Sequence, residues 1–209
     1  IALVHHKFTL ASQNLSLIRT KALKDEWFRE VWGDFAADED IGTKEMLVWP
    51  CADRNASKDF SMTVSGLTAS LTGGHYDAII VDDPVTEDHI KSKATRDETS
   101  LKYSALLFTL DTLRGKLFHT GTRYHVNDLW ARLLKAKDDD GRLLYSRTIV
   151  QAVAEDGSYI FPTRLSAKFL DRRRREIMEA NAGSDILWWL QYQNAVRTTE
   201  QVAADPAWL

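Results

Sequence analysis

A short apolar run that ends in two adjacent carboxylates constrains the fold of this chain more than any other feature. The run from Ala78 to Val81 leads directly into Asp82, Asp83 and Pro84. A continuous apolar run rich in β-branched residues is typical of a strand buried on both faces, as in a parallel sheet. Carboxylates have no place inside such a strand. We therefore expect them at its carboxyl end, the edge at which open α/β sheets bind ligands.

Two interpretations fit a pair of carboxylates in this position. In a nucleotide hydrolase, a strand that ends in this way is a Walker B element: the first acid, here Asp82, holds Mg²⁺, and the second, Asp83, polarises the attacking water. The alternative is a solvated turn that closes a strand, because Asp-Asp-Pro is common in loops.

The rest of the chain alternates between strand-like and helix-like patterns. Strands are predicted at residues 1–4, 46–49, 60–64, 78–81, 116–120 and 144–150. Helices are predicted at residues 9–31 with Gly33 as the stop, 96–113, 126–135 with Asn127 or a neighbour as the cap, 166–181 with Ser166 as the cap, and 184–194. This alternation predicts a three-layer α/β sandwich with a largely parallel sheet over residues 1–160, followed by a helical region over residues 161–209.

Composition and charge exclude few classes of function. The 209 residues carry a net charge of −3, so any contact with nucleic acid needs a local basic patch. The single cysteine, Cys51, excludes an internal disulfide and fits a reducing compartment. No apolar run approaches the length of about 20 residues that a membrane-spanning helix needs. The chain starts in an apolar strand without methionine and ends in Trp208 and Leu209, so we expect it to be an internal piece of a longer protein.

A second polar motif follows the strand predicted at residues 116–120. Thr120, Gly121, Thr122 and Arg123 would reach the same edge of the sheet as the two acids. A threonine hydroxyl beside Walker B acids can sense the γ-phosphate, and an arginine can bind phosphate with two hydrogen bonds. The alternative is a plain strand-to-helix connection, in which Gly121 supplies backbone freedom and Thr122 or Asn127 caps the next helix. The combination with Asp82 and Asp83 favours the phosphate interpretation.

These motifs together resemble the large terminase subunit of tailed bacteriophages. Residues 73–84 are similar to the Walker B region of that family, and residues 121–125 with 128–129 are similar to its coupling motif. Residues 161–166 and 189–194 resemble the segment that links its ATPase and nuclease domains, and residues 1–14 resemble the strand and helix that follow its phosphate-binding loop.

The resemblance implies a fold, an activity and partners. The fold would be a P-loop ATPase sandwich of the ASCE type over residues 1–160, with a linker over residues 161–209. The activity would be ATP hydrolysis, with Mg²⁺, that drives double-stranded DNA into a viral capsid. Asp82 would hold the metal, Asp83 would be the catalytic base, and Thr120, Gly121, Thr122 and Arg123 would couple hydrolysis to movement. The implied partners are the portal protein, the small terminase subunit and further copies of the chain in a ring, in the host cell cytoplasm and without a membrane.

The chain departs from the family pattern in three respects. It contains no G-x-x-x-x-G-K-[ST] phosphate-binding loop, which the family places upstream of Ile1, so we expect this chain alone to be inactive. The nuclease domain would likewise follow Leu209. Many relatives carry glutamate where this chain has Asp83, which makes Glu87 the alternative base.

Two other classes of function remain open: an interaction module without chemistry of its own, and another P-loop motor such as a helicase. A helicase should contain a second similar domain with arginine and glutamine motifs that bind nucleic acid, and this sequence contains no such motifs. Other features are better explained by structure than by function. His5 and His6 would point to opposite faces of a strand, so one metal could not easily bind both. We expect residues 172–175 to form a solvated helix face and residues 188–189 to be packed. Cys51 has no pair of a histidine and an aspartate near it in the sequence that would make it a nucleophile.

Overall fold

The computed structural model describes residues 1–32, 42–48, 60–69 and 74–196, which form a mixed α/β structure around a five-stranded sheet. The strands are β1 (Ala2–His5), β2 (Met46–Leu47), β3 (Met62–Gly66), β4 (Ala78–Asp82) and β5 (Lys116–Thr120). Their order is β2-β3-β1-β4-β5, and all neighbours are parallel except β2 and β3. The α/β class and the largely parallel sheet predicted from the sequence are confirmed.

The helices complete two compact units. They are α1 (Phe8–Lys24), α2 (Glu26–Trp32), α3 (Asp88–Lys91), α4 (Lys93–Leu107), α5 (Leu129–Leu133), α6 (Ala167–Ala180) and α7 (Ile186–Gln193). The first unit contains Ile1–Pro84 and Asp97–Gly121, and the second contains the described residues of Val85–Arg96 and Thr122–Leu209. The predicted domain division at residue 160 stays a prediction.

Alternation along the strands gives the sheet of the first unit two different faces. Leu3, Val64 and Ile80 lie in register on one face, which α1 covers with side chains that recur at helical spacing. The resulting core contains Leu3, Ala11, Leu15, Leu47, Met62 and Val64. Each fully buried leucine among them stabilises the fold by about 1.5–3 kcal/mol.

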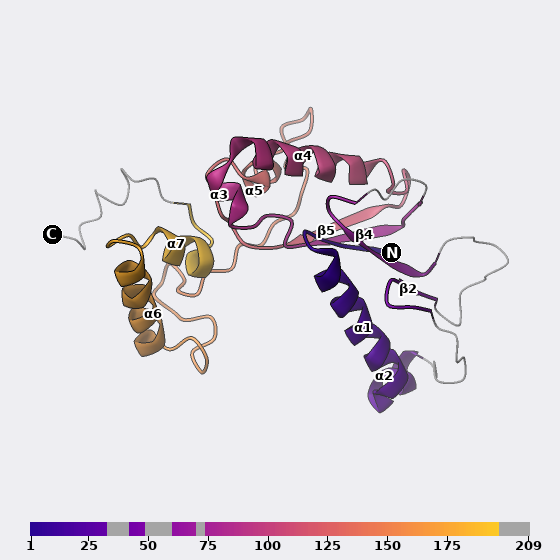
Figure 1. Ribbon diagram of the computed structural model, residues 1–209, viewed down its shortest axis with the longest axis horizontal. Helices are drawn as coiled ribbons and strands as arrows, with labels where there is room; N and C mark the ends of the chain where they lie inside the picture. Colours follow the sequence, from indigo (N-terminus) through magenta and orange to yellow (C-terminus); the bar gives the residue numbers. More distant parts are fainter. Residues whose placement is uncertain (33–41, 49–59, 70–73, 197–209) are drawn as a thin grey trace. The chain divides into compact units, whose positions relative to one another are not determined.

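The opposite face of the sheet carries Val4, Val81 and His119 in register. Figure 1 shows α4 on this side of the sheet and α1 on the other. The hydroxyl of Tyr103, on α4, shares a hydrogen bond of 2.6 Å with Nε2 of His119. This bond fastens α4 to β5.

Burial of His119 predicts a stability that falls with acidification. Desolvation lowers the pKa of the His119 imidazole from its ordinary value near 6.5. The unfolded chain therefore binds a proton at a higher pH than the folded chain does, and stability that is complete above about pH 6.5 is lost as the pH falls through and below that value. We expect urea unfolding to give a smaller loss of stability between pH 7.5 and pH 5.5 in His119→Gln, whose amide can still bind Tyr103. An equal loss in both proteins would show that His119 does not contribute.

The predicted helix over residues 9–31 is in fact two helices. The break falls at Asp25, whose N–H bonds the carbonyl of Lys21 and closes α1. The Asp25 carboxylate then accepts the N–H of Phe28 and starts α2. The periodicity of apolar residues continues through this break, which is why the sequence pattern predicted one helix. Gly33 lies outside the described residues.

The predicted helix over residues 96–113 is wrong at both ends. Helix α4 begins at Lys93 and ends at Leu107, and the short helix α3 before it was not predicted. After α4 the chain turns, because the Asp111 carboxylate accepts the N–H groups of Leu113 and Arg114. Aspartate favours such local hydrogen bonds over continued helix.

The strand predicted at residues 144–150 is also wrong. These residues are irregular, and no strand in the described part of the chain pairs with them. Leu144, Ile149 and Val150 are about half exposed. Apolar and β-branched residues alone are not sufficient for a strand, because the backbone groups of a strand need a neighbouring strand with which to pair.

The remaining elements match their predictions with small shifts. Strand β1 starts one residue later than predicted, β3 starts two residues later, and β5 has the predicted bounds. Ser166 caps α6 as predicted, since its hydroxyl accepts the N–H of Phe169. Strand β2 covers only Met46–Leu47, and Trp49 lies outside the described residues.

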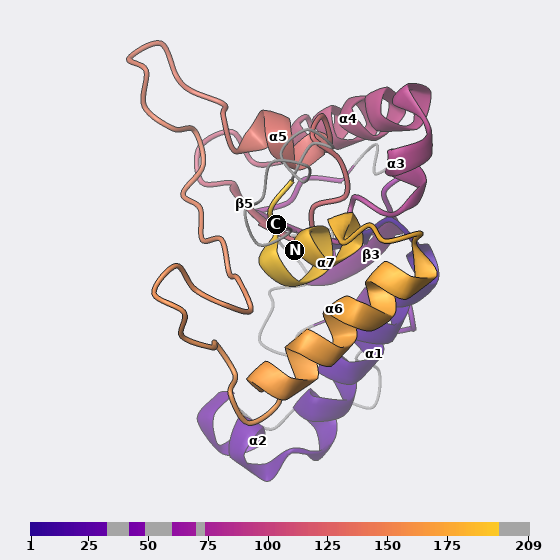
Figure 2. The same cartoon turned by 90° about the vertical axis from the view of Figure 1, so that its left-hand side faces the viewer.

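In the second unit, α6 and α7 pack side by side (Figures 1 and 2). Two hydrogen bonds from the Arg174 guanidinium to the Asp185 carboxylate, at 2.9 and 2.5 Å, hold them together. Before α6, the chain forms two small hairpins, bridged at Lys137 and Leu143 and at Val153 and Tyr159. No helix in the described part of the chain is long and apolar enough to span a bilayer.

Candidate functional site at the carboxyl edge of the sheet

Parallel pairing brings three polar side chains together at the carboxyl end of the first unit's sheet. His5, Asp82 and Thr120 are the last residues of β1, β4 and β5, and they lie in register on adjacent strands. Residues in register on neighbouring strands share one face of the sheet. Asp82 and Thr120, predicted from separate motifs, are therefore direct neighbours.

Two hydrogen bonds orient the Asp82 carboxylate. The Thr120 hydroxyl donates to its Oδ1 at 2.5 Å, and the Asn14 side-chain amide on α1 donates to its Oδ2 at 3.4 Å. Asn14 was not predicted as a site residue, because nothing in its sequence surroundings shows that α1 packs beside this strand end. The bond to Thr120 links the two predicted motifs physically.

Asp83 leaves the strand in an unusual backbone conformation. Its φ is +43°, in the left-handed region that only a few residue types, including aspartate, adopt readily. Its N–H donates to the Thr120 carbonyl at 3.1 Å. Burial, and secondly the charge of Asp82, raise the pKa of the Asp83 carboxyl above its usual value, and the nearby His5 and His6 partly oppose this. A carboxylate with a raised pKa is a better proton acceptor.

His5 and His6 lie closer together than the sequence predicted. Their ring centroids are 4.6 Å apart, whereas strand alternation predicted opposite faces. The difference arises because β1 ends at His5, so His6 lies beyond the regular strand. Nδ1 of His5 accepts the N–H of Lys7, and Nδ1 of His6 donates to the carbonyl of Asp83. Burial is the largest effect that lowers the pKa of His6.

The chain passes from the first unit to the second between Gly121 and Thr122. Gly121 has a φ of +152°, which a residue with a side chain rarely adopts. This φ agrees with the backbone freedom that the plain strand-to-helix interpretation assigned to Gly121. Thr122 uses its carbonyl to accept the indole N–H of Trp130 at 3.0 Å.

Arg123 and the fully buried Asp128 organise the start of α5. Nε of Arg123 donates to both carboxylate oxygens at 3.1 Å. The same carboxylate accepts the backbone N–H groups of Tyr124, His125 and Ala131. Asp128 thus caps α5, which agrees with the prediction of a cap at Asn127 or a neighbour, whereas the alternative cap Thr122 was wrong. The sequence did not distinguish Asp128 from Asn127.

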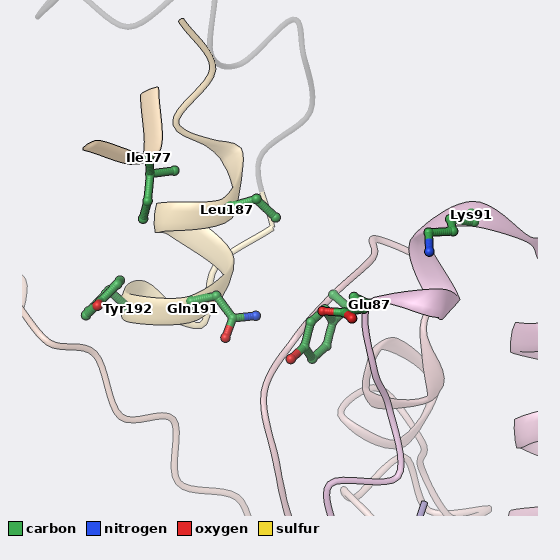
Figure 3. Close-up of a pocket in the computed structure, with 7 residues that line it drawn as sticks. Glu87, Lys91, Ile177, Leu187, Gln191 and Tyr192 are labelled. Atoms are coloured by element: carbon green, nitrogen blue, oxygen red, sulfur yellow. The ribbon is translucent and has the colours of Figure 1, made fainter. Parts of the chain in front are cut away.

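Glu87, the alternative base, lies in the second unit at the start of α3. It lines a cavity of about 700 Å³ (Figure 3). Glu87 and Lys91 form one side of this cavity, and Ile177, Leu187 and Gln191 contribute to the other. The immediate surroundings of Glu87 are therefore different from those of Asp82 and Asp83.

The residues at the strand end fit part of a Mg²⁺-nucleotide site. No group of three or more histidine, cysteine, aspartate or glutamate side chains that could hold a metal occurs among the described residues. Mg²⁺ bound to a nucleotide does not need such a cage, since one carboxylate, phosphate oxygens and water complete its shell. The Asp82 carboxylate, held in place by Thr120 and Asn14, fits that role.

The arginines at residues 172–174 and the tryptophans at residues 188–189 have structural roles. Arg174 is not part of a solvated face, because it binds the buried Asp185, whereas Arg172 and Arg173 pair with Glu176. Trp188 is buried and contacts Trp189 edge to face, so these residues pack within the second unit. Cys51 lies outside the described residues.

Comparison with known proteins adds no family to this description. No protein-family model matches the chain, and no curated protein matches it.

Proposed function

We propose that this chain is part of the ATP-hydrolysing motor of a phage terminase large subunit, which drives double-stranded viral DNA into a capsid in the host cytoplasm. The observation that carries the proposal is the joined cluster of Asp82, Asp83 and Thr120 at the carboxyl edge of a parallel sheet. This is the edge at which α/β sheets bind ligands. The resemblance of the sequence motifs to the terminase family adds the coupling to DNA.

Each residue has a chemical role in this proposal. Asp82 would hold Mg²⁺ through its oriented carboxylate, and the bound metal would neutralise charge on the β- and γ-phosphates. Asp83 would accept a proton from the attacking water, for which its raised pKa is favourable. Thr120 would report the state of the γ-phosphate, because its hydroxyl binds Asp82 directly.

The sheet offers a place for the phosphate-binding loop that the sequence lacks. Strand β5 forms one edge of the sheet in the described part of the chain. Its Lys116, Phe118 and Thr120 are exposed and share one face. A parallel strand added beside β5 would deliver the loop at its own carboxyl end next to Thr120. We propose that this chain is a piece of a longer parent protein, and that the parent protein supplies this strand and the loop.

The covalent path from the site supports a coupling role for Thr120, Gly121, Thr122 and Arg123. The chain enters the second unit two residues after Thr120. There, two hydrogen bonds join Arg123 to Asp128, the cap of α5. Displacement of Thr120 by a change at the γ-phosphate would therefore pull directly on the second unit. In the proposed motor this movement would act on DNA, in a ring of copies bound to the portal protein and the small subunit.

The test of this proposal uses the parent protein and two aspartates of the same strand region. Asp82→Ala should weaken Mg²⁺-ATP binding about tenfold or more and should abolish DNA-stimulated ATP hydrolysis, because the metal loses its protein carboxylate. Asp77→Ala is the matched control, since Asp77 is an exposed aspartate at the opposite end of β4. Titration with a fluorescent nucleotide measures Mg²⁺-ATP affinity, and steady-state phosphate release measures the rate of ATP hydrolysis. If the two variants behave alike, the strand end is not a nucleotide site and an interaction module is the better description.

A further inference from the structure

The backbone of Asp83 is held from both neighbouring strands. Its N–H donates to the carbonyl of Thr120, the last residue of β5. Its carbonyl accepts a hydrogen bond of 3.1 Å from Nδ1 of His6, which directly follows β1. Both peptide groups that flank this residue are thus fixed by side chain or backbone atoms outside β4.

An aspartate with a φ of +43° has left the extended conformation of β4. Aspartate adopts the left-handed region more readily than most residues do, but this region is less favourable than the extended one, so the two hydrogen bonds stabilise the turn. A continued strand would place Asp83 on the face opposite Asp82. The left-handed turn breaks this alternation at the residue that follows the metal-binding position.

The His6 side chain can donate the hydrogen bond that the carbonyl of Asp83 accepts. A carbonyl oxygen only accepts hydrogen bonds, so Nδ1 of His6 carries the proton. His5, its neighbour, cannot share the role, because its own Nδ1 is the acceptor for the N–H of Lys7. The hydrogen bond to the Asp83 carbonyl is therefore made by Nδ1 of His6 and not by His5.

We infer that His6 is a positioning residue that holds Asp83 in the left-handed conformation in which it acts as the base. The inference rests on the proposed function and extends it to a residue outside the Walker B and coupling motifs. His6 acts through the Asp83 backbone and does not itself contact the nucleotide.

Two variants of the full-length parent test the inference at the level of a single atom. The amide nitrogen of asparagine is attached in the same way as Nδ1 of histidine, and the amide nitrogen of glutamine extends to the position of Nε2. We expect His6→Asn to retain kcat for ATP hydrolysis within about threefold. His6→Gln should lower kcat about 10- to 100-fold, as loss of an orienting partner does, with KM within about threefold. Melting temperatures of both variants show whether either effect is a loss of folding.

A double variant and a spectroscopic measurement separate this inference from the proposed function. His6→Gln should have no further effect on kcat in an Asp83→Asn background, because His6 acts through Asp83. Nitrogen-15 NMR of the wild-type protein should show the His6 proton on Nδ1. Equal kcat values for His6→Asn and His6→Gln, an undiminished effect in the Asp83→Asn background, or a proton on Nε2 alone would each overturn the inference. Normal hydrolysis by Asp83→Asn itself would instead overturn the assignment of the base.

Discussion

Asp83→Asn in the parent protein is expected to lower the rate of ATP hydrolysis by about two to four orders of magnitude. Asparagine has the size of aspartate but cannot accept a proton from water, so the loss should fall on the chemical step. Mg²⁺-ATP affinity should stay within about threefold, because Asp82 and its bonds to Thr120 and Asn14 are unchanged. Single-turnover phosphate release measures the chemical step apart from product release.

The matched comparison for this variant is Glu87→Gln. Glu87 lies in the second unit and lines a cavity together with Ile177 and Gln191, whereas Asp83 directly follows Asp82 in the first unit. We expect Glu87→Gln to hydrolyse ATP within a few-fold of wild type. Normal turnover in Asp83→Asn together with a loss in Glu87→Gln would move the base to Glu87.

The largest expected loss of stability follows from Arg174→Ala. Asp185 is 1% exposed, and Arg174 supplies two of the three hydrogen bonds made by its Oδ2, the third coming from the Trp189 indole. Its Oδ1 has no hydrogen-bond partner. Removal of Arg174 leaves a buried charge poorly compensated, which costs about 3–5 kcal/mol. It also removes the guanidinium that lies 5.0 Å from the Trp188 ring centroid.

Arg172→Ala is the control for this effect, because it changes the same residue type on the same helix. Arg172 pairs with Glu176 at the surface, and such pairs contribute at most about 1 kcal/mol. Urea unfolding, combined with amide hydrogen exchange over residues 167–193, compares the two variants. Equal losses would mean that the bond between Arg174 and Asp185 does not hold α6 to α7.

The sheet was predictable because its strands carry strong local signals. The apolar run before Asp82 and the run at residues 116–120 gave nearly correct bounds. The predictions that were wrong depend on information outside the local pattern. Asp25 ends a helix through hydrogen bonds of its own, and residues 144–150 lack a pairing strand in the described part of the chain.

The acidic residues of the candidate site could be predicted from the sequence, but the residues that orient them could not. Asp82 and Thr120 could be placed at one edge because parallel strands end at the same side of a sheet. Asn14 and His6 could not, because their contacts depend on how α1 and the end of β1 lie beside β4. The partner of Arg123 was missed for a related reason: Asp128 is five residues away, and only the turn between them makes the ion pair.

The most direct test of the central claim is a structure of the parent protein with Mg²⁺ and a non-hydrolysable ATP analogue. The proposal predicts the γ-phosphate at the carboxyl end of β4, with the metal held through Asp82 and the attacking water within hydrogen-bond reach of Asp83. It also predicts the phosphate-binding loop on a strand paired with β5. A nucleotide bound elsewhere in the parent, with the ends of β4 and β5 free of phosphate and metal, would contradict the account.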